Sequence, residues 1–158
     1  MKIIKKLITA TVLLSLILLP QFQAKANTIN GTGDESIHCT TVIEEIPVSA
    51  NPGISLYSTA KTKTGSKTVC YKNADNETLW YVKVTATFSY NGSTSTCKSA
   101  SVTAASNNSY WKVSNKKSSY SGNHGTASAT GKKYLFGIVT STINSSATLT
   151  CSPNGTLS

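Results

Sequence analysis

The segment spanning residues 79–90 alternates apolar and polar side chains without interruption. Because successive side chains of a β-strand point to opposite faces of a sheet, this alternation predicts one long strand with a single buried face. The side chains expected on the buried face are Trp80, Val82, Val84, Ala86, Phe88 and Tyr90, and those on the other face are Tyr81, Lys83, Thr85, Thr87 and Ser89.

Asn91-Gly92 follows this strand directly and is a dipeptide typical of two-residue hairpin turns, because both positions of a type I′ turn favour positive φ. With such a turn, Cys97 stands opposite Ala86 on the buried side of the hairpin. Cys97 is therefore expected to point into the core, as a structural half-cystine should.

The chain after residue 26 consists of short alternating runs separated by turn residues, and it shows no helical periodicity. Serine and threonine make up 43 of these 132 residues. The expected fold is all-β: a single antiparallel β-sandwich domain of the Ig-like kind. Further strands are expected at residues 37–46, 54–59, 67–72, 110–114, 126–130, 134–143 and 148–152, with turns at residues 51–53, 73–76, 107–108, 121–125, 144–146 and 153–155.

Residues 1–26 have the three parts of a cleaved secretory signal peptide. Three lysines lie among the first six residues, an apolar run covers residues 7–19, and Ala24-Lys25-Ala26 presents small residues to a signal peptidase. The apolar run is shorter than the ~20 residues that a membrane-spanning helix needs. We therefore expect a secreted protein without a membrane span, in which residues 27–53 form an N-terminal lead-in with a first strand and residues 54–158 form the β-sandwich core.

All 15 basic residues are lysines, and four of them lie in the expected signal peptide. The remaining eleven lysines and six acids are unevenly distributed: residues 27–77 carry a net charge of −2, whereas residues 78–158 carry seven lysines and no acid. A basic half without acids attracts polyanions by long-range steering. The alternative is that lysines on strand faces and edges only keep the protein soluble. The lack of arginine disfavours sequence-specific nucleic-acid binding.

Four cysteines follow the signal peptide, and an even number in an exported chain predicts two disulfides with three possible pairings. We expect Cys39 to pair with Cys70 and Cys97 with Cys151. Their wide spacing, without any C-x-x-C, disfavours a zinc site.

Several segments resemble a family of small secreted proteins from Gram-positive bacteria. The similarity covers roughly residues 54–158 and rests on a "TFxYNG" strand and turn (TFSYNG) and a terminal "LTCxxNGxLS" signature (LTCSPNGTLS). The resemblance implies a secreted β-domain and transfers no active site.

Catalytic and metal-binding residues are sparse. His124 lies in a turn with no acid among the last 81 residues, and His38 lies beside Cys39 on an expected strand. Glu44 and Glu45 are adjacent, so on a strand they point to opposite faces and cannot act as an acid–base pair. No D-x-D-x-D-G calcium loop is present. The chain is therefore expected to be non-enzymatic and to need no cofactor or metal.

Binding at the bacterial envelope is the favoured function, with an anionic wall polymer or a glycan as the partner. Trp111 and Val113 are expected to face inward, next to outward tyrosines and lysines that suit ring stacking on sugars and contacts with phosphates. The ligand face expected on this basis consists of Tyr81, Lys83, Tyr110 and Lys112. Two alternatives are a secreted bacteriocin-like antagonist or effector, and a structural subunit of a surface assembly.

Overall fold

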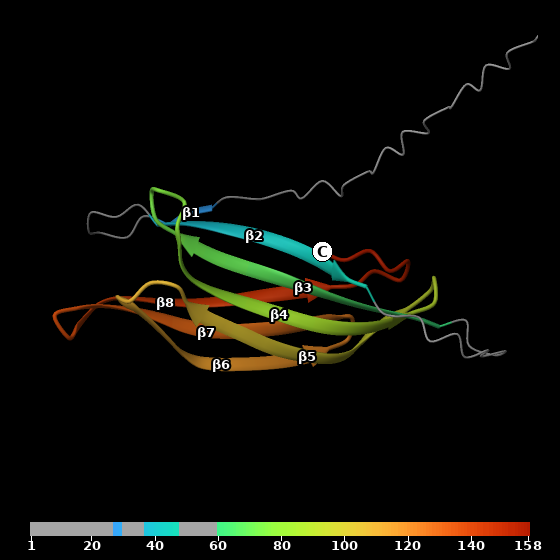
Figure 1. Cartoon of the computed structure of the whole chain (residues 1–158). Helices are drawn as coiled ribbons and strands as arrows, with labels where there is room; N and C mark the ends of the chain where they lie inside the picture. The colour runs from blue at the N-terminus through green and yellow to red at the C-terminus, as the bar shows by residue number, and fades with distance from the viewer. Residues whose placement is uncertain (1–26, 30–36, 48–59) are drawn as a thin grey trace, which may run out of the picture.

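The computed structural model describes residues 27–29, 37–47 and 60–158, and the strand predicted at residues 54–59 lies outside this range. The described chain is all-β and forms two antiparallel sheets (Figure 1). The five-stranded sheet contains β1 (Asn27–Ile29), β2 (Ile37–Ile46), β3 (Lys61–Lys72), β4 (Thr78–Tyr90) and β5 (Ser95–Ser106). The three-stranded sheet contains β6 (Trp111–Ser121), β7 (His124–Leu135) and β8 (Ile138–Thr150). No helix long and apolar enough to cross a membrane occurs in the described residues.

Within each sheet the strands follow one another in chain order, and every neighbouring pair is antiparallel. Each sheet is therefore a meander. The expected Ig-like connectivity is wrong for the described strands, since that fold requires Greek-key connections between sheets. Strands that are consecutive in the chain are neighbours within each sheet, whereas a Greek key returns a later strand to lie beside the first one. Within the predicted lead-in, β1 pairs with β2.

The predicted buried face of β4 is confirmed except at its end, where Tyr90 is only partly buried. Trp80, Val82, Val84, Ala86 and Phe88 are at most 1% exposed and form the centre of the core. Buried side chains of the three-stranded sheet, and Cys151 directly after it, complete the same cluster, so the two sheets enclose one core. The residues of the sheet are Trp111, Ala127, Ala129, Ala147 and Leu149.

An aromatic stack crosses this core. The Tyr71 and Trp80 rings are parallel within 5°, with centroids 4.4 Å apart, and the Trp80 and Trp111 centroids lie 6.2 Å apart. The backbone of Gly131 on β7 packs closely against Trp80. A Cβ added at this position would come within 2.4 Å of the indole Cε2. A glycine is therefore required where the second sheet meets the face of the indole.

The β4–β5 hairpin differs from its prediction. The connection has four residues, and the Asn91 side-chain oxygen accepts the backbone N–H groups of Ser93 and Thr94 at 3.0 and 2.8 Å. This local hydrogen bonding, typical of asparagine at the start of a turn, replaces the two-residue turn. Cys97 consequently stands opposite Phe88 instead of Ala86. The register differs by an even number of residues, so the prediction that Cys97 faces the core is confirmed.

The strands predicted at residues 67–72, 110–114 and 126–130 correspond to the longer strands β3, β6 and β7. Two other predictions are wrong. The strand predicted at residues 134–143 is divided by a tight turn at Phe136 and Gly137, both of which have positive φ. The turn predicted at residues 144–146 lies inside β8 instead, where the Asn144 Oδ1 accepts a hydrogen bond from the Thr130 hydroxyl at 2.8 Å. Asparagine and serine, which are common in turns, thus occur inside this strand, where hydrogen bonds to the neighbouring strand are available to their side chains. The turns predicted at residues 73–76, 107–108 and 153–155 are confirmed.

Candidate binding surfaces

The structure separates the four residues of the predicted ligand face into two pairs. Tyr81 and Lys83 lie on the outer side of β4, an inner strand of the five-stranded sheet between β3 and β5. Tyr110 and Lys112 lie at the start of β6, at an edge of the three-stranded sheet. Because the inner faces of both sheets share one core, their outer faces point away from each other. The four residues do not form one surface.

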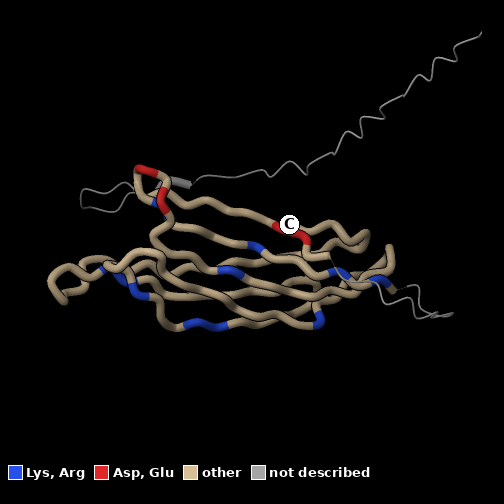
Figure 2. The backbone as a smooth tube through the Cα atoms, viewed as in Figure 1, with Lys and Arg blue, Asp and Glu red and all other residues tan. Residues whose placement is uncertain are grey.

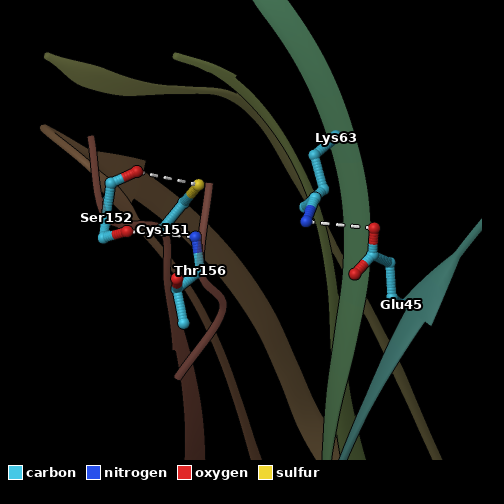
Figure 3. A network of polar contacts seen from close by, with 5 residues as sticks. All are labelled: Glu45, Lys63, Cys151, Ser152 and Thr156. Atoms are coloured by element: carbon cyan, nitrogen blue, oxygen red, sulfur yellow. Dashed lines mark hydrogen bonds and ion pairs between the residues drawn. The ribbon is translucent and has the colours of Figure 1, made fainter. Parts of the chain in front are cut away.

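The lysines of the five-stranded sheet are partly neutralised by acids of β2. Lys83 Nζ lies 3.2 Å from Glu44 Oε2, and Lys63 Nζ lies 3.0 Å from Glu45 Oε1 (Figure 3). The two glutamates reach lysines on opposite faces of the sheet, as their adjacent positions predict. Lys83 is therefore already engaged within the protein.

The Glu44–Lys83 pair supports a prediction about pH. The hydrogen bond and charge of Lys83 hold the pKa of the Glu44 carboxyl below its ordinary value of 4.5, and a hydrogen bond from Ser66 adds to this. A lowered pKa in the folded state stabilises the protein above pH 4.5, and the effect is lost as the pH falls through the lowered value. Replacing Lys83 with methionine should return the Glu44 pKa toward 4.5 in an NMR titration.

The same substitution should reduce the free energy of unfolding at neutral pH by well under about 1 kcal/mol, since both side chains are substantially exposed. Lys67→Met on β3 is the control, and it should leave the titration of Glu44 unchanged. An unaltered Glu44 pKa in the Lys83→Met variant would contradict the assignment of this ion pair.

The three-stranded sheet carries positive charge without acids. Residues 111–158 contain five lysines and no aspartate or glutamate, whereas the described acids all lie on β2 or in the turn before β4 (Figure 2). Lys112 stands directly opposite Lys132 on the neighbouring strand, and the Lys112 ammonium lies 5.0 Å from the centroid of the Tyr134 ring. We call the three lysines that the register places on the outer side of this sheet the basic face: Lys112, Lys117 and Lys132.

The turn between β7 and β8 exposes a group of apolar side chains that the sequence reasoning missed. Phe136 is 104% exposed and Ile138 is 69% exposed, and Leu135 and Val139 are also exposed. In the sequence, five apolar residues around a single glycine resemble the interior of a strand. The Phe-Gly pair inside that run is the one signal that indicates a turn.

The four cysteines are free thiols in the structure, so the two predicted disulfides are not seen. The expected pairing of Cys39 with Cys70 is also wrong in its geometry. Cys39 stands opposite the inward-facing Tyr71, whereas Cys70 stands opposite Thr40. Because directly opposite residues share a face, the two cysteine side chains point to opposite sides of the sheet. A disulfide needs Cβ atoms that face each other at about 3.8 Å.

Cys97 and Cys151, in contrast, are brought together inside the core. Both are at most 4% exposed, and their backbone N–H groups donate to the consecutive carbonyls of Gly122 and Asn123, at 2.7 and 3.0 Å. Burial raises the pKa of the Cys97 thiol, and the neighbouring Cys151 thiol raises it further. The Cys151 thiol donates to the Ser152 carbonyl at 3.4 Å, next to the C-terminal turn in which Ser152 also binds Thr156 (Figure 3).

Within the described residues, each histidine ring contacts a side-chain amide. His38 Nε2 lies 3.0 Å from Asn76 Oδ1, and His124 Nδ1 lies 3.3 Å from Asn123 Oδ1. No group of three or more potential metal ligands occurs in residues 37–47 and 60–158. A small cavity of about 250 Å³ lies between the β4–β5 loop and the C-terminal turn. Its lining residues are Lys61, Tyr90, Asn91, Gly92, Pro153 and Asn154.

Comparison with known proteins adds no assignment to these surfaces. No family model, no curated protein and no solved structure matches this chain. The basic face and the apolar turn are therefore interpreted from their own chemistry.

Proposed function

We propose that this chain is an exported, non-enzymatic β-sandwich protein that binds an anionic polymer of the bacterial envelope through its basic face. This proposal retains Tyr110 and Lys112 from the expected ligand face. It moves the site away from Tyr81 and Lys83, because Lys83 is engaged by Glu44. The leader-like residues 1–26 support export, and the acid-free second half of the chain supports an anionic partner.

The observation that carries the proposal is the cross-strand juxtaposition of Lys112 and Lys132. Like charges directly opposite one another on neighbouring strands are destabilising, because their Cβ atoms lie only about 5 Å apart. No acid of the same sheet relieves this repulsion, since residues 111–158 contain none. A bound phosphate or carboxylate would relieve it. Lysine ammonium groups suit a flexible polyphosphate, which needs point charges rather than the planar fork of arginine.

Sedimentation with purified cell wall tests this proposal. The mature protein should co-sediment with wall at low salt and be released as the salt concentration rises, since screening weakens these contacts. The double variant Lys112→Gln/Lys132→Gln should bind roughly tenfold less tightly or weaker, given about 1 kcal/mol for each lysine at an anionic surface.

The matched control is Lys61→Gln/Lys72→Gln, which removes the same charge from the five-stranded sheet. It should retain most of the binding. Equal losses in the two double variants would show that net charge alone, and not the basic face, governs the interaction. Failure of the wild-type protein to sediment with wall at low salt would exclude wall binding altogether.

A second candidate function is an antagonist that acts on other cells, and the exposed apolar turn at Phe136 favours it. A protein with this function should produce a zone of inhibition on related strains, whereas a wall-binding protein should not. The Phe136→Asn variant should abolish such a zone.

We further propose that export joins Cys97 and Cys151 as a disulfide. Their burial at the same turn supports this pairing, and an oxidising compartment supplies the conditions that it needs. The bond would tie β5 of one sheet to the end of β8 in the other. We do not propose a disulfide between Cys39 and Cys70, because their side chains lie on opposite faces of the five-stranded sheet.

A further inference from the structure

We propose that the β7–β8 turn inserts into the surface of a lipid bilayer that contains anionic headgroups. The inserting residues are Leu135, Phe136, Ile138 and Val139, which we call the apolar tip. The proposal differs from wall binding in the apolar tip and in its lipid partner, although Lys112 and Lys132 at the base of the tip also belong to the basic face.

The apolar tip is unusual in the extent of its exposure. Phe136 is 104% exposed and Ile138 is 69% exposed, so the whole Phe136 side chain projects into solvent at the end of the hairpin. Elsewhere in the described chain the most exposed large apolar side chains are single tyrosines at the ends of strands. A contiguous exposed apolar patch marks an interaction site more often than scattered residues do.

The backbone of the turn gives a second, independent reason. Leu135 pairs with Ile138, so Phe136 and Gly137 form a two-residue turn, with φ of +50° and +82°. Positive φ at the first position favours asparagine, aspartate or glycine, whereas a bulky residue is disfavoured there by steric contact. Phenylalanine therefore weakens the turn that it occupies. The proposed contact of the Phe136 side chain with lipid explains why phenylalanine occupies this position.

Tyrosines and lysines surround the base of the tip. Tyr134 precedes it and is partly buried. The Tyr134 N–H donates to the Tyr110 carbonyl at 2.7 Å, which brings the exposed Tyr110 to the same place. Lys112 lies over the Tyr134 ring, and Lys132 stands opposite Lys112. Tyrosine is favoured at the headgroup level of a bilayer, and lysines near the surface are attracted to anionic lipids.

The shape of the tip favours lipid over a protein partner. A stable protein interface buries about 800 Å² on each partner, and a turn with four apolar side chains offers a small, convex surface. A convex tip needs a complementary groove in a protein, but it enters a fluid bilayer without one. The tip and the last strand residues reach roughly 5–10 Å deep, to the boundary between headgroups and acyl chains. This is insertion into one leaflet and far short of a span.

Flotation with vesicles tests the proposal on the full mature chain. The wild-type protein should float with vesicles of phosphatidylcholine and phosphatidylglycerol, and much less with phosphatidylcholine alone. Phe136→Asn should lower the partition coefficient roughly tenfold or more, because burial of one large apolar side chain is lost. The same variant should unfold at a temperature a few degrees higher, since asparagine suits the turn. Loss of binding together with a gain in stability cannot result from misfolding.

Tyr120→Ser is the matched control. Tyr120 is 56% exposed and stands opposite Gly125, roughly 30 Å from the tip along β7, so its loss should leave flotation unchanged. Phe136→Trp should bind like the wild type and show a blue-shifted fluorescence when vesicles are added.

Three results would overturn the proposal. The first is undiminished flotation of Phe136→Asn. The second is equal binding to neutral and anionic vesicles, which would remove the role of the lysines. The third is a lipid-free dimer that Phe136→Asn dissociates, which would assign the tip to a second copy of the chain. Wall sedimentation of Phe136→Asn should stay at the wild-type level, so failure of this proposal is distinguishable from failure of wall binding.

Discussion

Replacing Gly131 with valine is expected to lower the free energy of unfolding by about 3 kcal/mol or more. A single Cβ at this position would lie 2.4–2.7 Å from three atoms of the Trp80 indole. The indole has no free space on its other side, since it is stacked on Tyr71 and packed near Trp111. The two sheets must therefore move apart or the aromatic stack must break.

Urea unfolding measures this effect, and Ser128→Val is the matched control. Ser128 lies on the same strand, and its odd separation from Gly131 puts it on the outer face, so valine there should change stability by less than about 0.5 kcal/mol. A smaller side chain at position 80 should make room for the valine. The loss in the free energy of unfolding in the double variant Trp80→Leu/Gly131→Val should therefore be clearly smaller than the sum of the two single losses. Additive losses would contradict the direct contact of Gly131 with the indole.

The second large effect is expected from the proposed bond between Cys97 and Cys151. In the chain-entropy model a cross-link that closes a loop of this length stabilises the folded state by about 4 kcal/mol. Reductant should therefore lower the urea midpoint of protein recovered from culture medium. The variant Cys97→Ala/Cys151→Ala should be less stable from the outset, and reductant should have no further effect on it.

Cys39→Ser/Cys70→Ser is the control for this experiment, and it should keep the full response to reductant. Alkylation of the unfolded wild-type protein without reductant should modify two thiols and leave two protected. Modification of all four thiols would contradict the bond. A mapped bond between Cys39 and Cys70 would contradict the observed register, because β2 would have to slip by one residue and turn Ile37 and Ile43 away from the core.

The positions that could be predicted from local pattern are those where one face of a strand is buried. The buried residues of β4 and the bounds of β2 follow from the period of two, which depends only on neighbouring residues. Inward Trp111 and outward Lys112 on β6 follow in the same way. Predictions of turns were less successful, because serine and asparagine serve as readily in cross-strand hydrogen bonds as in turns.

The candidate sites were predictable only in part. The sequence shows an excess of lysine over acid in its second half, but not that Glu44 engages Lys83 across the two halves. The apolar tip was hidden for a different reason. Five apolar residues around a glycine resemble a buried strand, whereas the pairing of Leu135 with Ile138 and the positive φ of Phe136 and Gly137 show that the chain reverses there.

From the order of residues alone, the chain is an antiparallel β-protein with an amphipathic central strand and a basic second half. These properties depend on alternation and on counting, so they need no knowledge of which strands are neighbours. The tertiary structure decided which side chains share a face: it separated Tyr81 from Tyr110, placed Cys39 and Cys70 on opposite sides, and set Lys112 beside Lys132. Register and sheet membership determine such contacts, and both arise from the packing of distant segments around the Trp80 stack.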